Sequence, residues 1–200
     1  MKWIVGVDEV GRGPIAGPVT VCAAAMPFRV YRNTRWQKGP VGLTDSKLMT
    51  ALARDAWYQK VTGLAKDGTL RFSVVSVPAS AIDSRGISAC IRSCIARALK
   101  KLSIDPRDCI VLLDGGLAAP SDYARQETVI KGDRHHRIIS LASVIAKVTR
   151  DQYMILQHRR FPRYGWERNK GYGTASHYGA LATYGPCDMH RKSFITKVKC

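Results

Sequence analysis

Short apolar runs rich in β-branched residues alternate along the chain with longer segments in which apolar residues recur at helical spacing. The short runs predict strands over residues 3–7, 19–26, 71–77, 109–116 and, as a short edge strand, 127–133. The longer segments predict helices over residues 44–66, 87–102, 137–160 and 174–184. This alternation is typical of a sheet protein of the α/β or α+β class.

The first two predicted strands are separated by a loop that carries Gly11, Gly13 and Gly17, which predicts a hairpin. In the first predicted helix, apolar residues four or five apart suggest the buried face: Leu48, Leu52, Ala56 and Val61. The sequence shows no internal repeat, low-complexity segment or linker. We therefore expect one domain over residues 1–200.

The chain is strongly basic, with 32 Lys and Arg against 15 Asp and Glu and a formal net charge of +17. Its hydrophobic content of 46% argues against a disordered basic tail, so we expect a folded protein that binds a polyanion. The six cysteines form no CxxC pair and no zinc-type cluster with histidine, which favours reduced, mostly buried thiols. No run has the length of a signal peptide or a membrane span, so we expect a cytoplasmic protein away from membranes, by default a monomer.

Carboxylates follow three of the predicted strands. Asp8 and Glu9 come after residues 3–7, Asp114 after an apolar run, and Asp133 after the edge strand. Such strand ends can converge at one edge of a sheet. An acidic cluster repels itself unless a cation is bound, and hard oxygen ligands suit Mg²⁺ or Mn²⁺. Two such ions could orient water and stabilise the leaving oxygen of a phosphodiester, which indicates a metal-dependent nuclease.

Two of these carboxylates also have a structural alternative, whereas Asp8 and Glu9 have no obvious packing role. Asp114 precedes two glycines and could form a turn, and Asp133 could cap the long helix that follows it. Asp8 and Glu9 are neighbours, so in a regular strand their side chains point to opposite faces. Both can reach one site only if the regular pleat ends there.

Seven motifs occur in the order and approximate spacing of type 2 ribonucleases H, specifically bacterial ribonuclease HII: VGVDEVGRGPIAGPV, GLTDSK, LLDGG, VIKGD, SVIAKVTRD, NKGYGT and HRKSF. The chain resembles this family from about Ile4 to Phe194. The resemblance implies a ribonuclease H-like fold, with a mixed central sheet flanked by helices and a helical C-terminal portion. It also implies cleavage of the RNA strand of RNA·DNA hybrids, and incision 5′ of single ribonucleotides in duplex DNA, leaving 3′-hydroxyl and 5′-phosphate ends.

The family's metal ligands, for Mg²⁺ or Mn²⁺, correspond to Asp8, Glu9, Asp114 and Asp133. Gly11, Arg12 and Gly13 resemble a loop whose backbone approaches the 2′-hydroxyl of the ribonucleotide, since glycine has no Cβ to intervene. Tyr172 resembles a tyrosine that stacks on the adjoining sugar and contacts the same hydroxyl. Basic residues of the motifs could contact phosphates: Lys47, Lys147, Arg150 and Lys170. Asp151 lies well inside the predicted long helix, and we interpret it as a structural acid.

The chain departs from the family pattern at Gly116, at Leu48 and at Arg85–Gly86, and none of these changes removes a carboxylate. A nucleotide-binding enzyme is one alternative, because GRGPIAG loosely matches a glycine fingerprint. That fingerprint needs a helix at the glycines, whereas Pro14 and the following VTV predict a strand. A non-catalytic nucleic-acid-binding module is the other alternative, and only turnover separates it from the nuclease.

Overall fold

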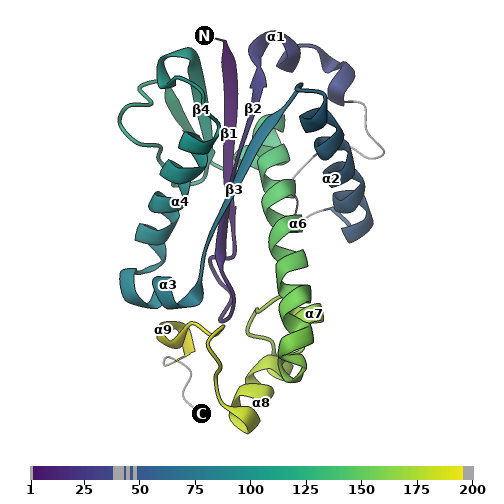
Figure 1. The fold of residues 1–200 in the computed structure, drawn as a ribbon, viewed down its shortest axis with the longest axis vertical. Helices are drawn as coiled ribbons and strands as arrows, with labels where there is room; N and C mark the ends of the chain where they lie inside the picture. Colours follow the sequence, from purple (N-terminus) through teal and green to yellow (C-terminus); the bar gives the residue numbers. More distant parts are fainter. Residues whose placement is uncertain (1, 38–42, 44–45, 47–48, 196–200) are drawn as a thin grey trace.

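The computed structural model describes residues 2–37, 43, 46 and 49–195. Within this part of the chain, five strands form one sheet in the order β3-β2-β1-β4-β5 (Figure 1). The strands are β1 Trp3–Val10, β2 Val19–Pro27, β3 Arg71–Val77, β4 Cys109–Asp114 and β5 Gln126–Val129. β2 pairs antiparallel with β1 and β3, whereas β4 pairs parallel with β1 and β5. The sheet is therefore mixed.

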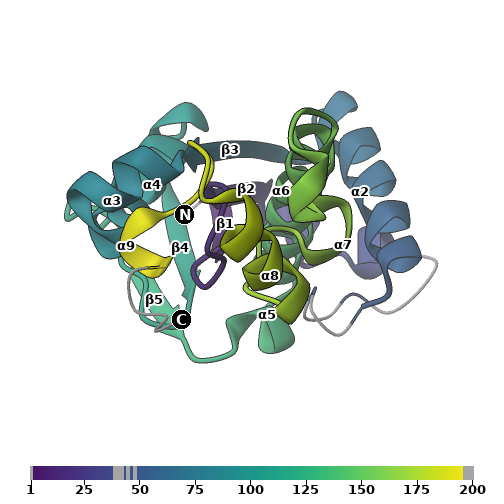
Figure 2. The ribbon, with the colours of Figure 1, turned by 90° about the horizontal axis from the view of Figure 1, so that it is seen from below.

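Helices cover both faces of this sheet. They are α1 Phe28–Tyr31, α2 Ala51–Lys66, α3 Ala79–Arg85, α4 Ile87–Lys101, α5 Gly132–His135, α6 Arg137–Arg160, α7 Trp166–Asn169, α8 Ala175–Tyr184 and α9 Lys192–Ile195, with 3₁₀ turns at Thr34–Gln37, Pro106–Asp108 and Pro162–Tyr164. Seen from below, α3 and α4 lie on one side of the sheet and α2 and α6 on the other (Figure 2). The expected α/β fold, with a mixed central sheet flanked by helices, is confirmed.

Each face of the sheet has its own apolar core. Val5 and Val7 of β1 pack with Ile91 and Ile95 of α4 on one face. The other core contains Ile4 of β1 with residues of α2 and α6, and the fully buried Trp57 of α2 is part of it. On this second face a Cβ added at Gly6 would lie 2.4 Å from the backbone carbonyl carbon of Ile138. β1 and α6 therefore approach each other as closely as a glycine permits.

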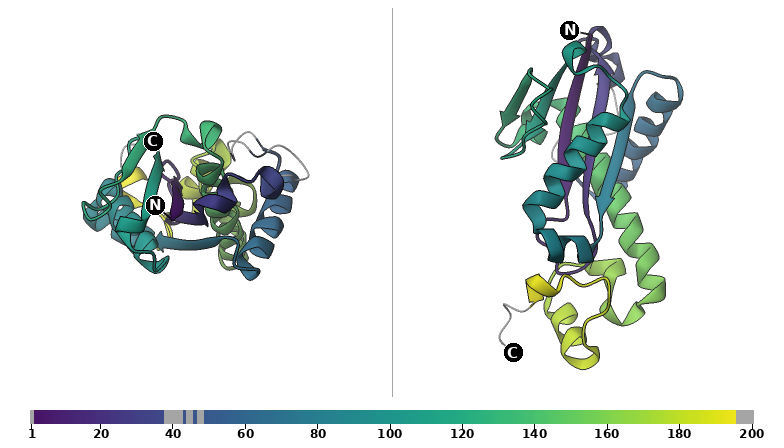
Figure 3. Two further views of the ribbon diagram at one scale, coloured as in Figure 1. Left: turned by 90° about the horizontal axis from the view of Figure 1, so that it is seen from above. Right: turned by 60° about the vertical axis from the view of Figure 1, so that its left-hand side comes forward.

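Helix α6 extends past the end of β1 and leads to the C-terminal helices (Figures 1 and 3). A third apolar cluster lies there, around the buried Tyr164 and Trp166. Ala16 from the loop between β1 and β2 and Met154 of α6 belong to the same cluster. The C-terminal portion is thus packed directly against the loop that follows the first strand.

The structure confirms most expected elements and corrects several details. β1 continues to Val10, so Asp8 and Glu9 lie inside the strand and not after it. Helix α2 begins at Ala51, capped by the Thr50 side chain, and buries Ala53, Trp57 and Val61, leaving Leu52 81% exposed. The expected apolar face was therefore right at Val61 and wrong at Leu52, and Leu48 lies outside the described residues. Helix α3 and the four-residue helices α1, α5, α7 and α9 were not expected.

The expected hairpin is confirmed, with β1 and β2 antiparallel over their full length. The predicted helix over residues 137–160 matches α6 residue for residue. Among the described cysteines, all five have free thiols and four of them are buried, as expected. A search of the described helices finds none that is both long and apolar enough to cross a membrane.

Candidate metal centre

Three of the predicted carboxylates meet at one end of the sheet. Oxygen atoms of Asp8, Asp114 and Asp133 all lie within 4.8 Å of one another. The parallel pairing of β1 with β4 explains two of them, because Val7 pairs with Leu113 and the next residue on each strand is an aspartate. The expected meeting of these three carboxylates is thus observed, although only Asp8 and Asp114 are brought together by neighbouring strands.

Asp133 reaches the group from a short helix and not from a strand. β5 ends at Val129, and Lys131 adopts a left-handed conformation with φ of 55° before α5 begins. The backbone N–H of Gly132 then donates to Asp114 Oδ1 at 2.7 Å, which ties the start of α5 to the end of β4. Asp133 does not cap α6, since the N-cap residue of that helix is His136. The capping alternative is therefore not supported.

The carboxyl group of Asp8 is buried and lies close to other negative charges. Burial first, then the charges of Glu9 and Asp114, raise the pKa of Asp8 to about 8, while hydrogen bonds from Ser143 and the Glu9 backbone oppose this shift. A bound cation would remove the repulsion. Three closely spaced carboxylates, two of them buried, are the oxygen donors that Mg²⁺ and Mn²⁺ prefer. The donor set therefore fits a divalent metal ion.

Glu9 lies on the opposite side of the pleat from Asp8. Across the hairpin Asp8 pairs with Cys22 and Glu9 with Val21, and these two partners belong to the cores on opposite faces. Glu9 Oε1 lies 2.7 Å from Nε of Arg12, and Glu9 is not a member of the three-carboxylate group. Because β1 keeps its pleat to Val10, the structure brings Asp8 alone of this pair into the group. A ligand role for Glu9 stays a prediction.

The two loops expected to contact substrate lie next to each other. Backbone N–H groups of Ile15 and Ala16 donate to the carbonyl of Gly171, at 2.9 and 3.2 Å. A Cβ added at Gly13 would meet no atom within 4 Å, so this backbone is open to an incoming molecule. Tyr172 follows Gly171 and is 41% exposed. Lys47, the other residue expected to bind substrate, lies outside the described residues.

Buried polar contacts hold the backbone of Tyr172. Nδ1 of His177 lies 2.9 Å from the Tyr172 carbonyl oxygen, which can only accept, so Nδ1 carries the hydrogen. Nε2 of His177 then accepts from Trp166 Nε1 at 3.1 Å and lies 3.1 Å from Nε2 of His190. Burial lowers the pKa of both histidines, that of His190 to about 4. Both imidazole rings are therefore neutral at physiological pH, and His177 holds the Tyr172 backbone by a direct hydrogen bond.

Of the two basic residues on α6 that were expected to contact phosphate, one contradicts the expectation. Arg150 is 1% exposed and donates to backbone carbonyls, so the expectation that it contacts phosphate was wrong. Lys147 forms an ion pair at 2.9 Å with Asp151, the acid interpreted as structural. The sequence reasoning missed Ser143, which hydrogen-bonds to Asp8 and whose hydroxyl lies 2.7 Å from that of Ser46. Its place in the SVIAK motif was the available signal.

The sequence model of the protein family described as ribonuclease HII matches residues 5–197 of this chain. This chain belongs to the ribonuclease HII family. A ribonuclease HII from Acidothermus cellulolyticus is 40% identical over 98% of the chain and 60% of its own length. One from Azorhizobium caulinodans is 42% identical over 97% of the chain and 69% of its own length. The chain thus spans about 60 to 70% of these ribonuclease HII sequences.

Solved structures support the same fold. Ribonuclease H2 from Pyrococcus horikoshii superposes with a TM-score of 0.71 at 24% identity, covering 97% of this chain and 94% of that one. Ribonuclease HII from Archaeoglobus fulgidus, solved in a complex with PCNA, gives 0.73 at 20% identity, covering 100% and 98%. A Bst ribonuclease HIII, solved in complex with Mn²⁺, gives 0.65 at 19% identity, covering 91% and 70%. The ribonuclease H-like fold expected for a ribonuclease HII is confirmed.

Proposed function

We propose that this ribonuclease HII is an endonuclease that hydrolyses the RNA strand of RNA·DNA hybrids and incises 5′ of single ribonucleotides in duplex DNA. The products would carry 3′-hydroxyl and 5′-phosphate ends, as in removal of RNA primers and of misincorporated ribonucleotides. The observation that carries this proposal is the meeting of Asp8, Asp114 and Asp133 within 4.8 Å of one another, on and beside the strand that leads into the Gly11–Gly13 loop, in a chain of net charge +17.

Asp8, Asp114 and Asp133 would hold the divalent ion, Mg²⁺ or Mn²⁺, with Glu9 as a fourth candidate ligand. When bound, such an ion polarises the phosphate and lowers the pKa of water, which supplies a nucleophile at neutral pH. The protein itself positions the carboxylates that would bind the ion. Ser143 and the Glu9 N–H hydrogen-bond to Asp8, and the Gly132 N–H orients Asp114. The ligands are thus held before the ion arrives.

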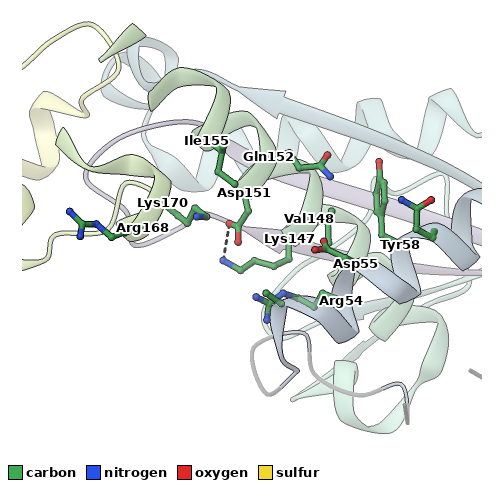
Figure 4. A pocket seen from close by; sticks show the side chains of 12 residues that line it. Arg54, Asp55, Tyr58, Lys147, Val148, Asp151, Gln152, Ile155, Arg168 and Lys170 are labelled. Atoms are coloured by element: carbon green, nitrogen blue, oxygen red, sulfur yellow. Dashed lines mark hydrogen bonds and ion pairs between the residues drawn. The ribbon is translucent and has the colours of Figure 1, made fainter. Parts of the chain in front are cut away.

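A basic groove between α2, α6 and α7 is a candidate path for the substrate backbone (Figure 4). It has a volume of about 630 Å³, and its cationic lining consists of Arg54, Lys147, Arg168 and Lys170. Burial lowers the pKa of Lys170, and the charges of Lys147 and Arg54 act in the same direction. Cations gathered in one groove repel one another unless anions lie between them, and the two carboxylates of the lining, Asp55 and Asp151, balance only two of the four positive charges. Phosphodiester groups would complete the neutralisation.

The groove begins close to the acidic group. Lys147 follows Ser143 by four residues on α6, slightly more than one helical turn or ~6 Å along the axis, and Ser143 contacts Asp8. A strand whose scissile phosphate lies at the acidic group could therefore reach the cations of the groove.

The nucleotide-binding alternative lacks the structure it needs. The glycine loop leads into β2, an antiparallel strand, whereas a glycine fingerprint requires a helix N-terminus that presents N–H groups to the pyrophosphate. The non-catalytic binding module is separated from the nuclease by the assay that follows.

Incubation with a DNA duplex that contains one ribonucleotide, in Mg²⁺ or Mn²⁺, is expected to give a single cut 5′ of that ribonucleotide. An RNA·DNA hybrid is expected to be cut within its RNA strand. Denaturing gels with end-labelled strands measure both reactions, with an all-DNA duplex and a chelator as controls. Binding without any cut, in either metal and on either substrate, would favour the binding module instead.

Gly13→Ala tests the approach of the loop to the 2′-hydroxyl. The added methyl group would meet no protein atom, so the melting temperature should not change. Displacing the ribonucleotide by the width of this methyl group is expected to lower cleavage at a single ribonucleotide about 10- to 100-fold. Gly179→Ala in α8 is the matched control, because its Cβ also meets no atom within 4 Å. Wild-type rates for Gly13→Ala would show that this backbone does not contact the substrate.

A further inference from the structure

Two buried arginines lie beside the substrate loops and outside the acidic group. Arg150 of α6 is 1% exposed, and Arg191, directly before α9, is fully buried. Each guanidinium donates three hydrogen bonds, all to backbone carbonyls. Within the described part of the chain, no carboxylate lies at ion-pair distance from either one. Both positive charges therefore face backbone carbonyl dipoles, and the guanidinium of Arg191 also lies 5.1 Å from the ring centroid of Phe194.

Arg191 closes the loop between β1 and β2. Its Nη2, Nη1 and Nε donate to the carbonyls of Gly11, Arg12 and Gly17, at 2.6, 2.9 and 3.0 Å. Its backbone N–H also donates to the carbonyl of Ile15 at 2.8 Å. One side chain thus contacts both ends of the loop.

Arg150 links this loop to the one that carries Tyr172. Its Nε and Nη2 donate to the carbonyls of Pro18 and Ala16, at 3.0 and 3.2 Å, and its Nη1 donates to the carbonyl of Lys170 at 2.9 Å. Lys170 precedes Tyr172 by two residues, so a single planar group holds both loops. The hydrogen bonds from Ile15 and Ala16 to Gly171 join the same two segments.

The glycines of these loops make room for this arrangement. A Cβ added at Gly11 would lie 2.5 Å from Nε of Arg150, and one added at Gly171 would lie 2.4 Å from the carbonyl oxygen of Ala16. Gly11 and Gly171 also have φ values of 93° and 86°, which disfavour other residues. The absence of a Cβ at Gly11 thus leaves room for the Arg150 side chain, whereas Gly13 faces open space.

Burying two cations side by side costs free energy. Burial and the charge of Arg150 lower the pKa of Arg191 to about 9. An apolar pair would avoid this cost, so stability alone does not explain the arrangement. A planar fork of donors can hold three carbonyls in a defined geometry, which the point charge of a lysine cannot do. The geometry points to a precise spacing between the two loops as what the buried arginines provide.

We propose that Arg150, supported by Arg191, is a positioning residue that sets the spacing between the Gly11–Gly13 loop and Tyr172 and thereby determines the preference for a single embedded ribonucleotide. The inference rests on the proposed function. A single ribonucleotide offers one 2′-hydroxyl, so both loops must meet the same nucleotide. A continuous RNA strand offers a 2′-hydroxyl in every register, so an altered spacing is tolerated there.

Arg150→Lys tests this inference. Values of kcat/KM are measured in the same metal on a duplex with one ribonucleotide and on an RNA·DNA hybrid. The ratio of the two values is expected to fall about 10- to 100-fold, because a misplacement of about 1 Å costs a comparable factor. Arg191→Lys should lower the ratio in the same direction and serves as the second variant if Arg150→Lys does not fold. Ile95→Ala, in the core under α4, is the control: it lowers the melting temperature but leaves the ratio unchanged.

A double variant tests whether Arg150 acts through Tyr172. If it does, adding Arg150→Lys to Tyr172→Ala lowers the ratio no further than Tyr172→Ala alone. An equal loss on both substrates in a folded Arg150→Lys protein, or a fully additive double variant, would overturn the inference. Failure of the proposed function is distinguishable, because the wild-type protein would then cut neither substrate.

Discussion

Asp8→Asn and Asp114→Asn are each expected to lower kcat on an RNA·DNA hybrid by about 10³-fold or more, since a catalytic metal ion contributes several kcal/mol and each 1.4 kcal/mol is tenfold in rate. Both replacements keep the shape of the side chain and remove one anionic ligand from the group. Substrate binding, measured by gel shift, should be largely retained, because the basic groove is unchanged. Single-turnover cleavage measures the loss.

The stability of Asp8→Asn supplies the control for folding. The pKa of Asp8 is raised from 3.8 to about 8 in the folded protein, so the folded state keeps a proton that the unfolded state has lost between these values. Without metal, wild-type stability should therefore fall as the pH rises from about 4 to about 8, on the order of a few kcal/mol. Asp8→Asn lacks this loss and should be the more stable protein at pH 8.

Asp151→Asn is the matched acid control. Asp151 is paired with Lys147 on α6 and is not a member of the acidic group. We expect the dependence of its turnover on Mg²⁺ or Mn²⁺ concentration to follow that of the wild-type protein. A change in this dependence as large as that of Asp133→Asn would show that the wrong acid was chosen.

Gly6→Ala is expected to destabilise the fold by about 3 kcal/mol or more, at or above the upper range for overpacking. The new Cβ would lie 2.4 to 2.6 Å from backbone atoms of Ile138 and Ile139 at the start of α6, and backbone cannot turn aside as a side chain can. β1 and α6 would have to separate. Urea denaturation measures the loss. Activity should fall as well, because β1 carries Asp8 and α6 carries Ser143.

Gly63→Ala in α2 is the control for this substitution. Its Cβ would meet no atom within 4 Å, so the change should stabilise the protein by up to about 1 kcal/mol through the helix propensity of alanine. If Gly6→Ala were as stable as the wild-type protein, β1 and α6 would have more freedom to separate than the structure indicates.

Elements with strong local signals could be predicted from the sequence alone. The helix over residues 137–160 and the strand over residues 71–77 match α6 and β3 residue for residue, because one is long and rich in apolar positions at helical spacing and the other is short and rich in valine. Asp8, Asp114 and Asp133 were also chosen from sequence, and the parallel pairing of β1 with β4 brings the first two together as expected, whereas Asp133 comes from α5. The family was determined as well, by ordered motifs along nearly the whole chain.

Features that depend on contacts between distant segments could not be predicted from the sequence. α2 buries Trp57 and leaves Leu52 exposed because α6 and the sheet determine which of its faces is covered. Arg150 looked like a phosphate ligand, yet it is buried, since carbonyls of two loops far away in sequence converge on it. A local pattern reports the period of an element, but the partner of a side chain is set by how the elements pack.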